Sequence, residues 1–152
     1  MAELPQNLDA EQSLLGAIIL GETHGRSMFD TIDLLKPEDF VDRRNKLIYG
    51  AIKSVIQNDG QLDYTTIANE LKRQRIRLTE QYWNTILDKV PTAAHVQGYL
   101  DIVLTESLRR RYIELGQQLK TLGFNSELKI EELTKQANMV FDNLTNLSLI
   151  HI

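Results

Sequence analysis

The 152-residue sequence contains no cysteine. This absence excludes disulfide bonds, thiolate zinc sites and cysteine nucleophiles, and it is typical of a reducing compartment. The longest unbroken apolar run, Ala17 to Leu20, has four residues, whereas a membrane-spanning helix needs about 20. The N-terminal stretch is acidic and lacks the basic start and apolar core of a signal peptide. We therefore expect a cytoplasmic protein that does not contact membranes.

The sequence also has no excess of positive charge. It contains 17 Lys and Arg residues and 21 Asp and Glu residues, which gives a net charge of −4. Bulk electrostatics therefore do not indicate nucleic-acid binding. Basic residues still form three short clusters, at Arg43-Arg44, at 72–77 and at 109–111. The interpretation that we favour for each is a solvated helix flank. The alternative is contact with nucleic-acid phosphate, which needs charge but no particular motif.

Catalytic motifs are absent as well. The glycines Gly16 and Gly21 have phosphate-loop spacing, but a carboxylate, Glu22, follows where the phosphate-binding lysine should be. The three histidines are far apart and none has a second histidine one helical turn away, as a helical zinc site requires; they are His24, His95 and His151. No Ser or Thr lies in a nucleophile elbow. The sequence therefore predicts no catalytic residue, no cofactor site and no metal site.

Helical signals dominate what is present. Apolar residues at helical spacing predict several short helices before residue 91. Polar residues suited to capping precede three of these segments: Asp9, Thr65 or Thr66, and Thr79. No segment shows the sustained alternation of a β-strand. The first 95 residues are therefore predicted to form a compact helical head.

The chain changes character after Pro91. Five apolar residues are spaced 4-3-4-3 and six more 3-4-3-4-3, as in a coiled-coil seam; they are Leu108, Tyr112, Leu115, Leu119 and Leu122, then Ile130, Leu133, Ala137, Val140, Leu144 and Leu147. A turn near 124–128 makes the two helices antiparallel neighbours. We predict an all-α protein: a compact helical head (1–95), a long antiparallel helical hairpin for dimerisation (96–147), and a linker or added tail (148–152).

Four apolar residues of the predicted hairpin fall outside the seam: Ile102, Ile113, Met139 and Phe141. One interpretation is that they pack against the head or are exposed singly, as many apolar residues are. The interpretation that we favour is a second apolar face for self-association with another copy of the chain.

Four segments, in this order, carry a resemblance to a known family: LPQNLDAEQSLLGAIIL, LKPEDF, LDYTTIANEL and VPTAAHVQGYLDIVLTESLRRRYIELG. From about Pro5 to Leu144 the chain resembles the N-terminal domain of DnaB-family replicative DNA helicases. No single motif is specific, but the ordered set is. Two departures are Asn45, where the family often has histidine, and 78–81, which lacks the family's Gly-Gly turn.

The resemblance implies a non-catalytic collar, with the ATP- and magnesium-binding motor C-terminal to this chain. It implies dimers formed through the hairpins, arranged as a hexameric trimer of dimers around single-stranded DNA, in bacterial, phage or plastid-type replication. It also implies a docking surface for the C-terminal helicase-binding domain of primase, which we place at Tyr82, Ile113 and Leu119. We expect single-stranded DNA to bind weakly, or only in the full ring. The alternatives are an unrelated helical adaptor protein and a small helical enzyme.

Overall fold

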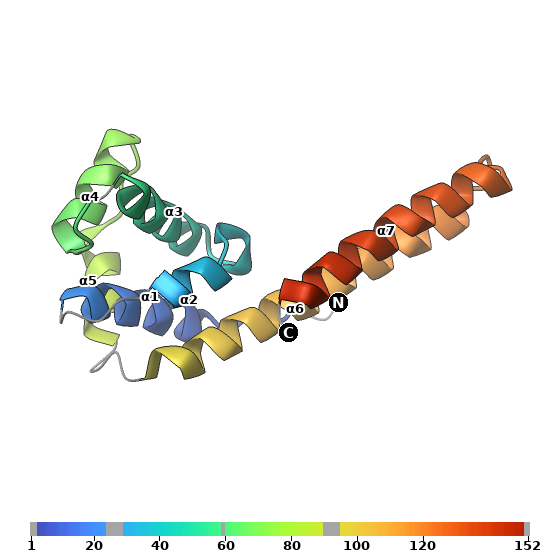
Figure 1. Cartoon of the computed structure of the whole chain (residues 1–152). Coiled ribbons are helices and arrows are strands. Elements are labelled where there is room, and N and C mark those ends of the chain that lie inside the picture. Colours follow the sequence, from blue (N-terminus) through green and yellow to red (C-terminus); the bar gives the residue numbers. More distant parts are fainter. Residues whose placement is uncertain (1–2, 24–28, 59, 90–94, 151–152) are drawn as a thin grey trace. The chain divides into compact units, whose positions relative to one another are not determined.

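The computed structural model describes residues 3–23, 29–58, 60–89 and 95–150. Within those ranges the secondary structure is helical, with no β-strand (Figure 1). The elements are α1 (Leu8–Thr23), α2 (Phe29–Leu34), the 3-10 helix η1 (Pro37–Asp39), α3 (Arg43–Gln57), α4 (Tyr64–Arg73), α5 (Glu80–Lys89), α6 (Val96–Phe124) and α7 (Ile130–Ile150). The all-α fold class is confirmed.

The chain divides into two compact units, which we call the head unit and the hairpin unit. The head unit is Gln6–Ser107, and the hairpin unit is Leu108–Ile152 with the N-terminal segment that ends at Pro5. The head extends past the expected boundary at residue 95 because Leu100 and Val103 of α6 are buried in its core. Ser107 also donates a hydrogen bond of 2.7 Å to Asp39.

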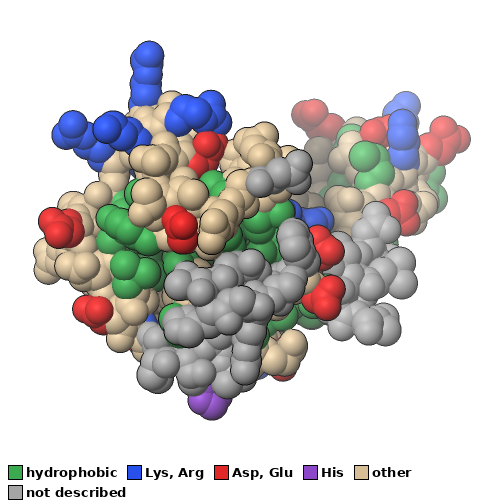
Figure 2. Space-filling model, turned by 60° about the vertical axis from the view of Figure 1, so that its left-hand side comes forward, with side chains coloured by type: hydrophobic (Ala, Val, Ile, Leu, Met, Phe, Trp, Pro, Cys, Tyr) green, Lys and Arg blue, Asp and Glu red, His purple; other side chains and the backbone are tan. Residues whose placement is uncertain are grey.

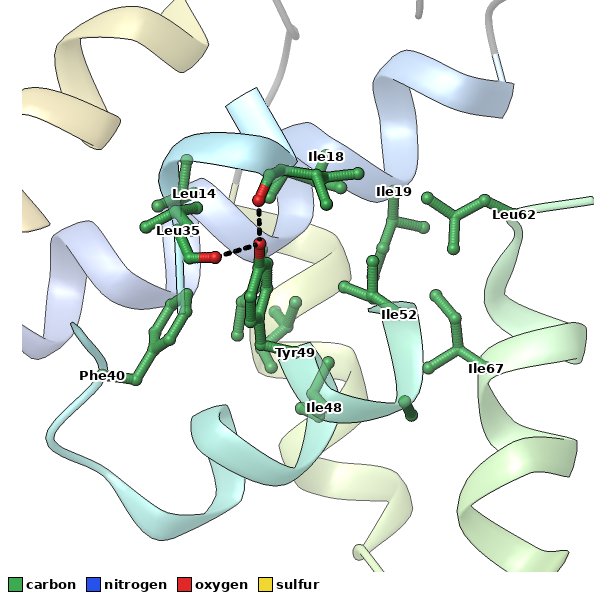
Figure 3. Packing of buried hydrophobic residues seen from close by; sticks show 14 of the residues in the cluster. Leu14, Ile18, Ile19, Leu35, Phe40, Ile48, Tyr49, Ile52, Leu62 and Ile67 are labelled. Atoms are coloured by element: carbon green, nitrogen blue, oxygen red, sulfur yellow. Dashed lines mark hydrogen bonds between the residues drawn. The ribbon is translucent and has the colours of Figure 1, made fainter. Parts of the chain in front are cut away.

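The core of the head unit forms between the apolar faces of α1 and α3, joined by side chains from the shorter helices (Figure 3). Tyr49 lies at its centre, with its ring centroid 5.2 Å from that of Phe40. Its hydroxyl donates to the backbone carbonyls of Ile32 and Leu35, at 2.8 and 3.1 Å. These two bonds tie the end of α2 to α3. Burial, with the nearby charges of Asp39 and Asp33, raises the pKa of Tyr49 far above its ordinary value.

The helix starts differ in part from the sequence prediction. Asn7, not Asp9, caps α1, because its side chain accepts a hydrogen bond of 2.9 Å from the Ala10 amide. Asp9 instead pairs with Lys89 of α5. At α4 the cap is the preceding residue Asp63, which exchanges hydrogen bonds with Thr66 in a capping box.

The predicted cap of α5 is confirmed, since the Thr79 hydroxyl accepts a 3.1 Å bond from the Tyr82 amide. At the other end of the chain, α7 continues to Ile150. Residues 148–150, which we expected to be linker or tail, are therefore helical. Among the described residues, none of the helices combines the length and the apolar character needed to cross a bilayer.

Candidate assembly and docking surface

The hairpin unit buries its coiled-coil seam incompletely. On α6, Leu115 and Leu122 are buried, whereas Leu119 is half-buried and Tyr112 is 46% exposed. On α7, the seam residues Leu133, Ala137 and Val140 are half-buried, and Ile130 is exposed. Two helices cannot enclose the seam between them, because each covers only one side of the other. The unit therefore leaves apolar surface uncovered.

Large apolar side chains are exposed along both helices of this unit. The exposed residues are Tyr112, Ile113, Phe124, Ile130, Met139 and Phe141. Single exposed apolar residues are common, but a group of them within one short unit indicates a surface for a partner.

Two of the residues predicted for self-association, Met139 and Phe141, lie on different sides of α7. Successive residues turn by about 100° around a helix, so Met139 and Phe141, on either side of Val140, point about 160° apart. Met139 and Val140 line a groove of about 710 Å³ between α6 and α7. Charged and amide side chains, such as Glu114 and Lys135, form much of its wall. Met139 therefore lies on the groove flank of the hairpin unit, on the side of α7 that points away from Phe141.

Ile113 and Phe141 are exposed outside this groove, and we call the surface that they present the apolar flank. Neither residue lines the groove. The connection between α6 and α7 is centred near residue 127, about 14 residues from both Ile113 and Phe141. Because the two helices are antiparallel, these two residues lie at the same level along the hairpin axis. Ile113 is 38% exposed and Phe141 51% exposed. Both residues are thus available outside the groove, and their role in self-association stays a prediction.

Ile102 lies in the head unit, on the part of α6 that belongs to it, and is 40% exposed. It lines a shallow pocket with His95, Gly98 and Tyr99. The His95 and Tyr99 rings meet edge to face, with centroids 6.4 Å apart. Ile102 is exposed as expected, but in this setting rather than in the hairpin unit.

Tyr82, predicted as a primase-docking residue, is only 5% exposed. Its hydroxyl donates to the side-chain oxygen of Asn45. The guanidinium of Arg44 lies over its ring, 3.7 Å from the centroid, and is held there by an ion pair with Asp42. Burial raises the pKa of the Tyr82 hydroxyl. Tyr82 therefore offers little surface as a direct apolar anchor, and its role in the fold is to pack under Arg44.

Sequence reasoning missed a buried polar network that joins α1, α3 and α5. Glu11 is 2% exposed and accepts hydrogen bonds from the Val41 amide at 2.8 Å and the Asn45 side-chain amide at 3.0 Å. Asn45 in turn accepts from Tyr82. Glu11 lies in the first of the four segments that carry the resemblance, and Asn45 is one of its departures, but neither observation indicated the hydrogen-bond partners.

Groups that could hold a metal ion do not occur in the described parts of the chain. Two of the three arginine clusters are partly occupied by structural contacts. Arg44 is engaged by Asp42 and Tyr82, and Arg110 donates a 2.8 Å bond to the Pro5 carbonyl within the hairpin unit.

A family model described as the DnaB-like helicase N-terminal domain matches residues 3–105. The chain belongs to this family. Among curated DnaB-type relatives, the replicative DNA helicase DnaB of Leifsonia xyli is 29% identical over 93% of this chain. The replicative DNA helicase DnaC of Bacillus subtilis is 31% identical over 88% of it. The chain spans about a third of each relative, 31% and 29% of their lengths.

A solved structure shows the same fold. It is the crystal structure of the N-terminal domain of DnaB helicase from Mycobacterium tuberculosis, with a TM-score of 0.80 and 30% identity. The match covers 91% of this chain and 99% of that one. This chain is therefore a DnaB-like N-terminal domain with the fold of its solved relative, and it corresponds to the part of such helicases that lacks the motor.

Proposed function

We propose that this chain is the non-catalytic collar of a hexameric replicative DNA helicase, and that it assembles the ring as a trimer of dimers through its hairpins. Family membership and the naming of its relatives as replicative DNA helicases support this proposal. They also remove the unrelated adaptor from consideration. ATP and magnesium would bind in the motor, outside this chain, and the setting would be the cytoplasm.

The observation that carries the proposal is the apolar flank of the hairpin unit, where Ile113 and Phe141 are exposed at one level. Burying a large apolar side chain contributes roughly 1.5–3 kcal/mol, so these two residues in both subunits contribute at most about 6–12 kcal/mol. Association costs an estimated 4–15 kcal/mol. Part of the exposed seam, such as Tyr112, must therefore be buried too. Two hairpins packed this way form a symmetric four-helix bundle.

Aspartate substitutions distinguish the two flanks of the hairpin. Phe141→Asp and Ile113→Asp place a charge on the apolar flank and are expected to shift the protein toward monomer, because an unpaired buried charge is costly. Met139→Asp makes the same change on the groove flank and serves as the matched control. Sedimentation velocity at micromolar concentration, with circular dichroism to confirm helicity, measures the outcome. Dissociation by Met139→Asp alone would assign assembly to the groove instead.

We also propose that the rim of the paired hairpins docks the C-terminal helicase-binding domain of primase. Ile113 lies on the flank assigned to pairing, so half-buried Leu119, about two turns further along α6, carries this proposal. Leu119→Ala is expected to lower the affinity for that primase domain about tenfold, as loss of an apolar anchor does, without dissociating the dimer. Isothermal titration calorimetry measures it. Unchanged affinity in a protein that still dimerises would place the docking site elsewhere.

A further inference from the structure

Four cations lie within six residues at the end of α4 and in the loop that follows: Lys72, Arg73, Arg75 and Arg77. All four are exposed. Figure 2 shows Lys and Arg side chains gathered along the upper edge of the head unit. Such a concentration of positive charge is unexpected in a protein whose net charge is −4.

One of the four cations is neutralised within the head unit. Arg73 pairs with Glu70 at 2.6 Å, and hydrogen bonds from Arg73, Ser54 and Gln74 lower the pKa of Glu70 to about 2. Glu70 is thus charged at neutral pH and committed to these partners. Lys72, Arg75 and Arg77 have no acidic side chain within ion-pair distance among the residues that the structure describes.

The helix dipole explains only part of the cluster. Cations in the last turn of a helix interact favourably with its C-terminal carbonyls, which accounts for Lys72 and Arg73. Arg75 and Arg77 lie beyond the helix end. Arg75 occupies the left-handed position of a Schellman turn, with φ of 62°, where glycine is usual. The Arg75 and Ile76 amides donate to the carbonyls of Lys72 and Leu71, both at 2.9 Å. A side chain at this position costs about 1 kcal/mol that glycine would avoid.

The chemistry of the cluster fits phosphate. Guanidinium groups match phosphate oxygens in a two-pronged geometry, and a flexible lysine supplements them as a point charge. The segment 72–77 contains no aromatic residue on which an unpaired base could stack. A ligand would thus be held through its phosphates alone.

We propose that Lys72, Arg75 and Arg77 form a sequence-independent contact for the phosphate backbone of DNA. The choice of DNA over another polyanion rests on the proposed role in a replicative helicase. Because no base is read or stacked, the contact does not need single strands. A duplex, whose phosphates are more closely spaced, binds at least as well.

The test uses this chain and two fluorescent probes, a duplex of about 20 base pairs and a thymidine oligonucleotide of equal length, at about 50 mM salt. Anisotropy measures the affinity. Lys72→Gln/Arg77→Gln is expected to lower affinity for both probes about tenfold or more, and to reduce the slope of log affinity against log salt by about 1.8 for the duplex. Arg43→Gln/Lys46→Gln removes two exposed cations from the start of α3 and is the matched control, expected to change affinity less than twofold.

Three results would overturn the proposal: equal affinities in the parent and the Lys72→Gln/Arg77→Gln protein, binding confined to the single strand, or tighter binding of polyglutamate than of duplex. The last result would indicate an acidic protein partner. The variant should sediment like the parent, because the cluster lies in the head unit and not on the apolar flank. Failure of DNA binding with normal assembly would therefore leave the collar proposal standing.

Discussion

A single buried carboxylate organises the residues around the start of α3. Glu11 receives hydrogen bonds from the loop before α3 and from Asn45, and Asn45 receives one from Tyr82. No buried side-chain polar atom is left without a hydrogen-bond partner among the described residues. Removing one member leaves the buried polar group of the next member without a hydrogen-bond partner. The loss of stability is then larger than the net contribution of the hydrogen bond itself.

Replacement of Tyr82 by Phe tests this network. The variant keeps the ring under Arg44 but removes the hydroxyl that donates to the Asn45 oxygen. We expect the free energy of unfolding to fall by about 1–3 kcal/mol, the cost of an unsatisfied buried acceptor. Urea denaturation followed by circular dichroism measures it. Tyr64→Phe, at a residue 40% exposed, is the control and should change stability by less than about 0.5 kcal/mol. Equal stability of the Tyr82→Phe protein and its parent would contradict the network.

Residue-scale features were only partly predictable from the sequence. The Thr79 cap follows from local chemistry and was predicted correctly. Asp9 was misassigned because Asn7 is an equally good cap; in the structure Asn7 caps α1, and Asp9 pairs with Lys89 of α5 instead. Likewise, an aromatic residue looks the same in a sequence whether it is an exposed anchor or buried, so the burial of Tyr82 could not be foreseen.

At the scale of helices, heptad spacing predicted the hairpin but not its flanks. The 4-3 pattern correctly indicates two long helices, because periodicity reports which side of each helix is apolar. It does not report which neighbouring residues share a surface after the chain reverses. That depends on how α6 and α7 pack, which places Met139 in the groove and leaves Ile113 and Phe141 outside it.

Gly116 lies in the middle of α6, where replacement by alanine is expected to stabilise the helix. A methyl group added there meets no atom within 4 Å, and glycine inside a helix is about 1 kcal/mol less favourable than alanine. Gly116→Ala should therefore raise the free energy of unfolding by about 0.5–1 kcal/mol, measured by urea denaturation at a concentration where the protein is monomeric. Gly98→Ala, with equal free space in the head-unit part of α6, should give a similar gain. Destabilisation by Gly116→Ala would mean that α6 does not have this geometry.

At the scale of the whole molecule, one helix belongs to two compact units. The first turns of α6 complete the head core through Leu100 and Val103, and the remainder forms the hairpin with α7. The sequence predicted a head followed by a hairpin, yet it placed their boundary at residue 95, before the long helix. Burial, not helix continuity, decides where the head ends, and burial is a tertiary property.

Ring assembly through the hairpins requires the hairpin unit to associate with a second copy of itself. Sedimentation equilibrium of the unmodified chain, across a range of micromolar concentrations, tests this most directly. We predict masses at multiples of the dimer, with a reversible shift toward the monomer mass on dilution, because the apolar flank is buried only in the paired state. A protein that retains the 17.5 kDa monomer mass throughout the range would contradict the collar assignment.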